Sequence, residues 1–173
     1  ELNDGSEGKT EAEEQEDIKE QILVVDDDSL NLMFAQKLLG EAYKTECVKS
    51  GQEALEYLAK ETPHLILLDL HMPEMDGFQV MEKLKEMERF SHVPVIFLTA
   101  DNDPETETRC FATGAVDFVA KPFIPDVLLS RVKKTLELES YRTGLEKMVE
   151  EQTRIITART RRISQIQEQV IMG

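Results

Sequence analysis

Five short runs rich in apolar and β-branched residues recur along this chain, and their order restricts the possible folds more than any other feature. The runs cover residues 21–26, 45–48, 64–69, 93–99 and 116–120. The third run, HLILLD, carries four apolar residues in succession, which is typical of a strand that is buried on both faces of a sheet. We therefore predict five β-strands in the interior of one α/β domain.

Stretches with helical spacing separate these strands. They cover residues 29–41, 51–60, 78–87 and 104–114, and a last helix begins at Ile124. The apolar side chains that we expect to share helix faces are Leu30, Phe34, Leu38 and Leu39 in the first helix, Ala54, Leu55 and Leu58 in the second, and Phe78, Met81 and Leu84 in the third. Strict alternation of strand and helix predicts right-handed crossovers and a parallel sheet. The expected fold is a doubly wound (βα)5 sheet of the flavodoxin type, with strand order 2-1-3-4-5.

Charge and composition exclude several classes of function. The 173 residues carry a formal net charge of -15, which disfavours direct binding to nucleic acid because phosphates would be repelled. Residues 1–20 hold many acids and few large apolar side chains, so we expect an acidic, disordered leader there. Two cysteines without metal-ligand spacing, and no long apolar run, predict reduced thiols, no membrane segment and a cytoplasmic location.

Polar residues gather where the predicted strands end. Asp26, Asp27 and Asp28 follow the first strand, Asp69 ends the third, Thr99 ends the fourth and Lys121 follows the fifth. Ligands of such sheets bind beyond the carboxyl ends of the strands. Clustered carboxylates repel one another unless a cation neutralises them, and Mg²⁺ prefers oxygen ligands. We therefore predict a Mg²⁺ (or Mn²⁺) site that accepts a phosphoryl group on an aspartate, with Lys121 and Thr99 binding phosphoryl oxygens. Asp28 is better explained as a helix N-cap than as a ligand.

Four segments resemble the receiver domains of bacterial two-component response regulators: ILVVDDD at 22–28, LILLDLHMPEMDG at 65–77, VIFLTA at 95–100 and GAVDFVAKPF at 114–123. The resemblance covers about residues 20–138 and fills all five signature positions, at Asp26, Asp27, Asp69, Thr99 and Lys121. It implies that Asp69 receives a phosphoryl group from the phosphohistidine of a histidine kinase or phosphotransfer protein.

The resemblance also assigns roles to the other positions. It implies that Asp27, Asp69 and the backbone carbonyl of His71 bind the metal directly, while Asp26 binds it through water. Thr99 is the switch hydroxyl, Lys121 pairs with the phosphoryl group, and the Lys121–Pro122 peptide bond is cis. Phe118 occupies the aromatic switch position. We expect the side chains of His71 and Asp101 to tune the rate of phosphoryl hydrolysis.

The last helix continues past the receiver-like part of the chain. Val149, Ile156, Ile163 and Val170 lie seven residues apart, and Leu138, Leu145 and Ile166 occupy the partner positions of the repeat. Gln152 and Arg159 interrupt it. β-branched residues at one position and Leu at the other favour a parallel two-stranded coiled coil, so we predict a homodimer through this seam. One amphipathic helix packed on the receiver is the simpler alternative, but the repeat is too long for that small surface.

Three segments follow from these observations: an acidic leader (1–20), a receiver domain (21–137) and a coiled-coil connector (138–173). The connector resembles those that precede HD-GYP-type phosphodiesterase or nucleotide cyclase domains, and no output motif is present, so we expect a piece of a longer regulator. Two other functions remain open. A haloacid-dehalogenase-like phosphatase also forms an aspartyl phosphate, although His71 stands where that family has a second aspartate. A non-catalytic dimerisation scaffold is the third.

Overall fold

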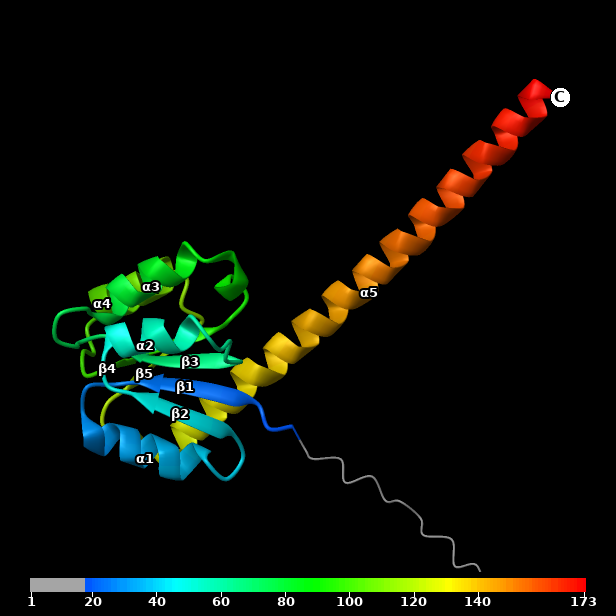
Figure 1. Cartoon of the computed structure of the whole chain (residues 1–173). Coiled ribbons are helices and arrows are strands. Elements are labelled where there is room, and N and C mark those ends of the chain that lie inside the picture. Colours follow the sequence, from blue (N-terminus) through cyan, green and yellow to red (C-terminus); the bar gives the residue numbers. More distant parts are fainter. Residues whose placement is uncertain (1–17) are drawn as a thin grey trace, which may run out of the picture.

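The computed structural model describes residues 18–173, which form a doubly wound α/β domain and one long helix (Figure 1). The first 17 residues of the expected acidic leader lie outside the described residues. The elements are β1 (Gln21–Val25), α1 (Ser29–Leu39), β2 (Lys44–Val48), α2 (Gly51–Leu58), β3 (Leu65–Asp69), α3 (Gly77–Lys85), η1 (Glu88–Phe90), β4 (Val95–Thr99), α4 (Pro104–Ala112), β5 (Asp117–Ala120) and α5 (Pro125–Met172). Each predicted element is present, with ends that differ by at most two residues.

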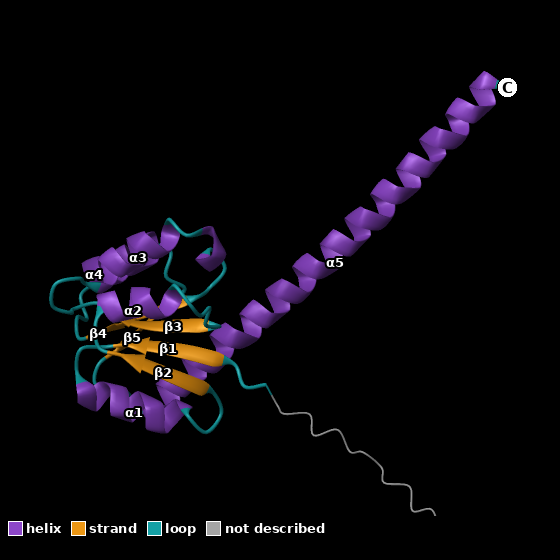
Figure 2. Ribbon diagram, viewed as in Figure 1, coloured by secondary structure: helices purple, strands orange, loops and turns teal. Residues whose placement is uncertain are grey.

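The sheet has the predicted parallel order β2-β1-β3-β4-β5. Helices α1 and α5 cover one face, and α2, α3 and α4 cover the other (Figure 2). The three central strands are buried almost completely, as their continuous apolar runs predict. This order brings the carboxyl ends of β1 and β3 together at the point where the chain reverses direction across the sheet.

The predicted apolar face of α1 is wrong at Leu30 and Phe34, while Leu39 is buried as predicted and Leu38 is half-buried. Leu30 and Phe34 are 73% and 40% exposed, whereas Leu32, Ala35 and Leu39 are buried against the sheet. Apolar residues occur all around this helix, so their spacing does not select one face. The small side chain of Ala35, which is fully buried, lies where α1 meets the sheet. In α2, Ala54 and Leu58 are buried as expected, while Leu55 is half-buried.

Helix α5 runs far beyond the sheet that its first turns cover (Figure 1). Its buried residues are Leu128, Val132, Thr135 and Leu136, and no side chain from Glu137 onward is buried. The exposed part of α5 therefore begins at Glu137. Among residues 18–173, no helix is long and apolar enough to cross a membrane.

Candidate functional site

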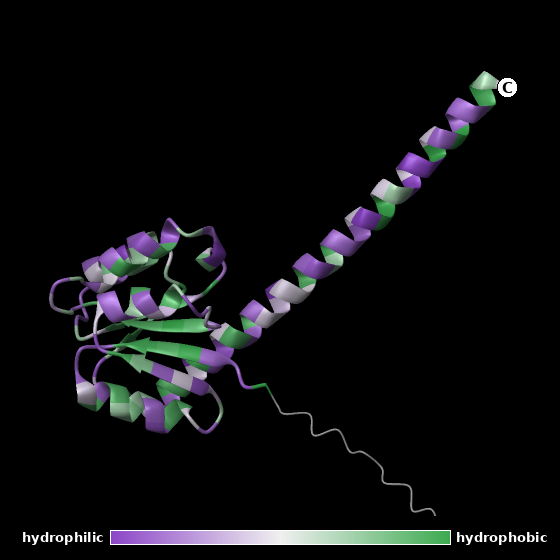
Figure 3. Ribbon diagram, viewed as in Figure 1, coloured by the Kyte–Doolittle hydropathy of each residue, from purple (hydrophilic) through white to green (hydrophobic). Residues whose placement is uncertain are grey.

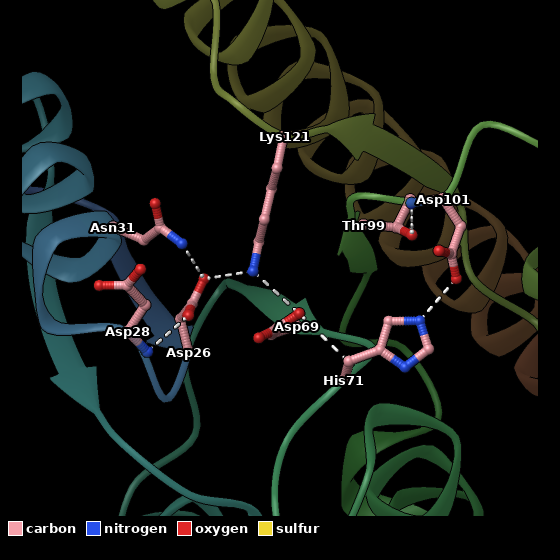
Figure 4. Close-up of polar contacts among 8 residues, drawn as sticks. All are labelled: Asp26, Asp28, Asn31, Asp69, His71, Thr99, Asp101 and Lys121. Atoms are coloured by element: carbon pink, nitrogen blue, oxygen red, sulfur yellow. Dashed lines mark hydrogen bonds and ion pairs between the residues drawn. The ribbon is translucent and has the colours of Figure 1, made fainter.

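Asp26 and Asp69 lie side by side because they stand at the carboxyl ends of the paired strands β1 and β3. Asp69 is the last residue of β3 and is 3% exposed, and Asp26 follows β1 and is fully buried. The predicted convergence of the strand ends at one crevice is visible in Figure 4. Asp27, in contrast, is exposed.

One lysine bonds to both buried carboxylates. The Lys121 Nζ atom lies 2.8 Å from Asp26 Oδ2 and 2.9 Å from Asp69 Oδ1 (Figure 4). Burial raises the pKa of Asp69 to about 6, and the hydrogen bond from Lys121 limits that increase. Burial alone would lower the pKa of Lys121, but its bonds to the two carboxylates raise it above the ordinary value. The two carboxylates therefore keep Lys121 protonated.

Further donors hold the two acids in place. The Asp26 carboxylate accepts the backbone N–H of Asp28, at 2.9 Å, and the side-chain amide of Asn31, at 3.2 Å. The backbone N–H of His71 donates to Asp69 Oδ1 at 3.2 Å. The sequence analysis did not identify Asn31, which lies in the first turn of α1 with its side chain toward Asp26. An amide side chain one turn after an acidic strand end is the signal that could have indicated it.

Asp28 caps α1, as predicted. Its side chain accepts the backbone N–H of Leu30 at 2.8 Å, so its oxygen is directed to the helix and away from the acidic crevice. This cap also explains why three successive aspartates diverge, since one is buried, one is exposed and one begins the helix.

A divalent cation fits the donor set. Asp26, Asp27 and Asp69 each offer a carboxylate oxygen, and these three oxygens lie within 4.8 Å of one another. Mg²⁺ holds oxygen ligands at about 2.0–2.1 Å, so only small side-chain shifts are needed to bring them onto one ion. Because Asp27 is exposed and the other two acids are buried, the donor set extends from the interior of the domain to its surface.

Thr99 and His71 lie on the side of Asp69 opposite Asp26 (Figure 4). Thr99, at the end of β4, is 1% exposed, and its Oγ1 accepts the backbone N–H of Asp101 at 2.9 Å. The His71 ring reaches across to Asp101, with 2.5 Å between Nε2 and Oδ2. This contact joins the loops that follow β3 and β4 beside Asp69.

Phe118 lies on β5, outside the carboxylate cluster. Its half-buried ring meets that of Phe111 on α4 edge-on, with 5.9 Å between ring centroids. The Lys121–Pro122 peptide bond is cis, as predicted. The seam residues of α5 are remote from the crevice, and all of them are exposed.

Comparison with known proteins agrees with this geometry. Residues 22–133 match the family model described as "Response regulator receiver domain". Over 116 residues the chain is 43% identical to a "Probable cyclic di-GMP phosphodiesterase" of Vibrio cholerae, covering 67% of this chain and 26% of that protein. It is 39% identical over 113 residues to the "Response regulator PleD" of Caulobacter vibrioides, covering 65% of this chain and 25% of that protein. The chain thus spans about a quarter of the length of these relatives.

Solved structures show the same fold. The receiver domain of a signal transduction histidine kinase from Syntrophus aciditrophicus superposes with a TM-score of 0.63 at 39% identity, covering 68% of this chain and 90% of that one. The "BeF3 Activated DrrB Receiver Domain" gives a TM-score of 0.63 at 34% identity, covering 69% and 98%. In both cases the matched share of this chain is about that of the α/β domain.

Proposed function

This chain belongs to the response regulator receiver domain family, and we propose that it acts in a two-component phosphorelay by accepting a phosphoryl group on Asp69. The donor is the phosphohistidine of a histidine kinase or phosphotransfer protein, and the reaction takes place in the cytoplasm. The observation that carries the proposal is the pairing of one partly buried lysine with two buried aspartates at the ends of adjacent strands.

The chemistry follows from the position of Asp69. A carboxylate oxygen attacks phosphorus, the phosphorus–nitrogen bond of the donor breaks, and the histidine leaves as neutral imidazole after it takes up a proton. The product is an acyl phosphate on Asp69. A pKa of about 6 leaves this carboxyl largely ionised, and hence nucleophilic, at neutral pH.

Asp26, Asp27 and Asp69, with the backbone carbonyl of His71, would hold Mg²⁺ or Mn²⁺. When bound, the cation neutralises negative charge on the carboxylates and on the incoming phosphoryl oxygens. Lys121 supplies the second positive charge, and its Nζ already lies within hydrogen-bond distance of Asp69. The residues therefore bind and orient the phosphoryl group by charge, with little further rearrangement.

We assign the readout to Thr99 and Phe118. The Thr99 hydroxyl oxygen accepts a hydrogen bond from Asp101, so its proton is available to donate to a phosphoryl oxygen on Asp69. Movement of Thr99 frees space behind β4, and Phe118 rotates inward to fill it. Phe118 has no hydroxyl group, so its signal is transmitted by packing against Phe111 alone.

His71 and Asp101 tune the lifetime of the phosphoryl group in this account. Their side chains join the loops after β3 and β4 beside Asp69. The pair restricts the approach of water to the acyl phosphate from that side, and so slows its hydrolysis.

An exposed apolar surface beside the crevice suits the partner protein. We call it the α1 patch, and it consists of Leu30, Met33, Phe34, Ile124 and Val127. The rings of Phe34 and Phe123 stack with 6.1 Å between centroids, so α1 and the start of α5 form one surface. Clustered exposed apolar side chains mark interaction sites. A helix that carries the phosphohistidine would pack here and present its imidazole to Asp69.

The exposed part of α5 transmits the signal as a parallel coiled-coil dimer. Its seam consists of Leu138, Leu145, Val149, Ile156, Ile163, Ile166 and Val170, each between 45% and 75% exposed. Apolar side chains recur along the whole helix in Figure 3, which supports burial against a second copy. The receiver is thereby connected to an output domain, and similarity to the Vibrio cholerae protein favours a cyclic di-GMP phosphodiesterase over a cyclase as that output.

Incubation with acetyl phosphate and Mg²⁺ tests the function. A labile adduct that forms on the chain and is lost in Asp69→Asn supports a phosphoacceptor. Turnover of a free phosphomonoester without a stable adduct would instead indicate a phosphatase.

A further inference from the structure

The exposed part of α5 carries apolar residues that the seam does not use. Tyr141, Met148 and Ile155 lie seven residues apart and are 69%, 63% and 44% exposed. We call them the second stripe. Their side chains are as accessible as those of the seam, and α5 projects away from the receiver along this length, so the receiver of the same chain cannot cover them (Figure 1).

The seam and the second stripe share one column of residues, which includes Leu138 and Leu145. A residue of that column is followed four positions later by a residue of the seam, as Leu145 is by Val149. It is followed three positions later by a residue of the second stripe, as Leu145 is by Met148. Both spacings, three and four, are those of a coiled-coil interface. Residues 138–155 can therefore pair through either side of the shared column.

Farther from the receiver only the seam is apolar. Ile163 and Val170 continue it, while Arg162 and Gln169 occupy the corresponding positions of the second stripe. An arrangement that uses the second stripe near the receiver and the seam beyond Ile156 contains one extra four-residue step. Such a step is a stutter, which coiled coils accommodate by local unwinding. The far part of the stalk can thus stay paired while the near part rotates.

Arg142 distinguishes the two arrangements. It holds the seam position one heptad before Val149, yet its guanidinium contacts His92 of its own receiver and also pairs with Glu139 and Glu146 of α5. One terminal nitrogen lies 2.9 Å from His92 Nδ1 and the other 2.7 Å from Glu139 Oε2. Arginine can only donate, so His92 Nδ1 accepts. In this position Arg142 and the loop before β4 occupy the side of α5 on which the seam would have to close.

We propose that α5 dimerises through two alternative interfaces near the receiver, and that the contact between Arg142 and His92 selects the second stripe. With the contact made, Leu138, Tyr141, Leu145 and Met148 face the partner copy. With the contact broken, Arg142 moves into the interface region and Leu145 and Val149 face it instead. The inference rests on the proposed dimer, and it names the residue that governs its register. His92 lies three residues before β4, the strand that ends in Thr99, so the selecting contact is linked to the acidic site by one strand.

Disulfide cross-linking of single cysteines tests the inference on the whole chain. In a background with Cys47→Ser and Cys110→Ala, Met148→Cys reports the second stripe and Val149→Cys reports the seam. Leu145→Cys lies in both interfaces and Lys147→Cys in neither. We expect cross-links at both 148 and 149. Arg142→Ala or His92→Ala should raise the ratio of 149 to 148 cross-links about two- to fivefold, as loss of an exposed charged contact would. Arg154→Ala, which removes a charge outside both interfaces, should leave the ratio unchanged.

The outcomes separate the inference from the proposed dimer. Cross-linking at Leu145→Cys, with a 149 to 148 ratio that neither Arg142→Ala nor His92→Ala changes, overturns the two-interface inference and leaves the dimer standing. Cross-linking at only one of positions 148 and 149 under every condition does the same. Absence of a cross-link at Leu145→Cys overturns the parallel dimer and the inference together, while phosphorylation of Asp69 is measured independently.

Discussion

Lys121 Nζ lies 2.9 Å from Oδ1 of Asp69, and the same ammonium group lies 2.8 Å from Oδ2 of Asp26. The proposed phosphoacceptor therefore belongs to a group in which one ammonium bonds to two buried carboxylates. A phosphoryl group and a metal ion that bind here replace contacts which the protein already makes.

Removal of the lysine charge should destabilise the metal-free protein. Lys121→Met leaves Asp26 and Asp69 buried without their cation, and we expect a loss of about 1–3 kcal/mol in the free energy of unfolding. Urea denaturation without divalent ions measures it. Lys133→Met, at an exposed position of α5, is the control and should change the stability little. Equal stability of Lys121→Met and the wild type would show that the Lys121 charge does not stabilise the two buried carboxylates.

Asp27 should contribute to metal binding and little to folding. It is exposed, so Asp27→Asn should leave the metal-free stability near that of the wild type. The Kd for Mg²⁺ should rise about tenfold or more, equivalent to about 1.4 kcal/mol. Titration calorimetry provides the measurement. Asp28→Asn removes the neighbouring charge but keeps a good N-cap, and an equal loss of affinity in this control would show that net charge alone is responsible.

Loss of the His71 side chain should shorten the phosphoryl lifetime. His71→Ala breaks the contact with Asp101 and opens one side of Asp69 to water, so we expect hydrolysis to accelerate about two- to tenfold. Decay of the acetyl phosphate adduct can be followed by mass spectrometry. His64→Ala, at the opposite end of the sheet, serves for comparison. An unchanged decay rate in His71→Ala would remove this residue from the account.

A charge in the α1 patch should affect one phosphoryl donor and not another. Leu30→Glu should slow transfer from a histidine kinase that phosphorylates the wild type, because the partner helix loses an apolar contact. Reaction with acetyl phosphate, which needs no docking surface, should be unaffected. Val116→Glu introduces the same charge at an exposed apolar position on another side of the domain. If both variants slow transfer equally, the patch has no special role.

The stalk should dimerise independently of the phosphorylation site. Ile163→Asp places a charge in the part of the seam that both proposed arrangements use, and we expect a monomer in light scattering at concentrations where the wild type is a dimer. Ala158→Asp, on neither interface, should remain dimeric. A wild-type monomer at high micromolar concentration would contradict the coiled coil.

The sequence predicted the fold and the residues of the crevice for the same physical reason. Continuous apolar strands that alternate with helices indicate a buried parallel sheet, and such a sheet brings the strand ends at Asp26, Asp69 and Thr99 together. It placed Leu30 and Phe34 wrongly on the buried face of α1, where Leu32 and Ala35 lie instead, because apolar residues surround that helix. Nor did it predict Asn31 or the His92–Arg142 contact. Both contacts depend on how a helix is positioned against the neighbouring loops, and the spacing of residues along the chain does not specify that position.

The most direct test of the central claim uses phosphoramidate, whose phosphorus–nitrogen bond has the chemistry of a phosphohistidine. Intact mass is measured for the wild type, Asp69→Asn and Asp27→Asn after incubation with phosphoramidate and Mg²⁺. The account predicts one added phosphoryl group on the wild type, none on Asp69→Asn, little on Asp27→Asn, and none on the wild type when the metal is chelated. An equal adduct on the wild type and on Asp69→Asn would contradict it.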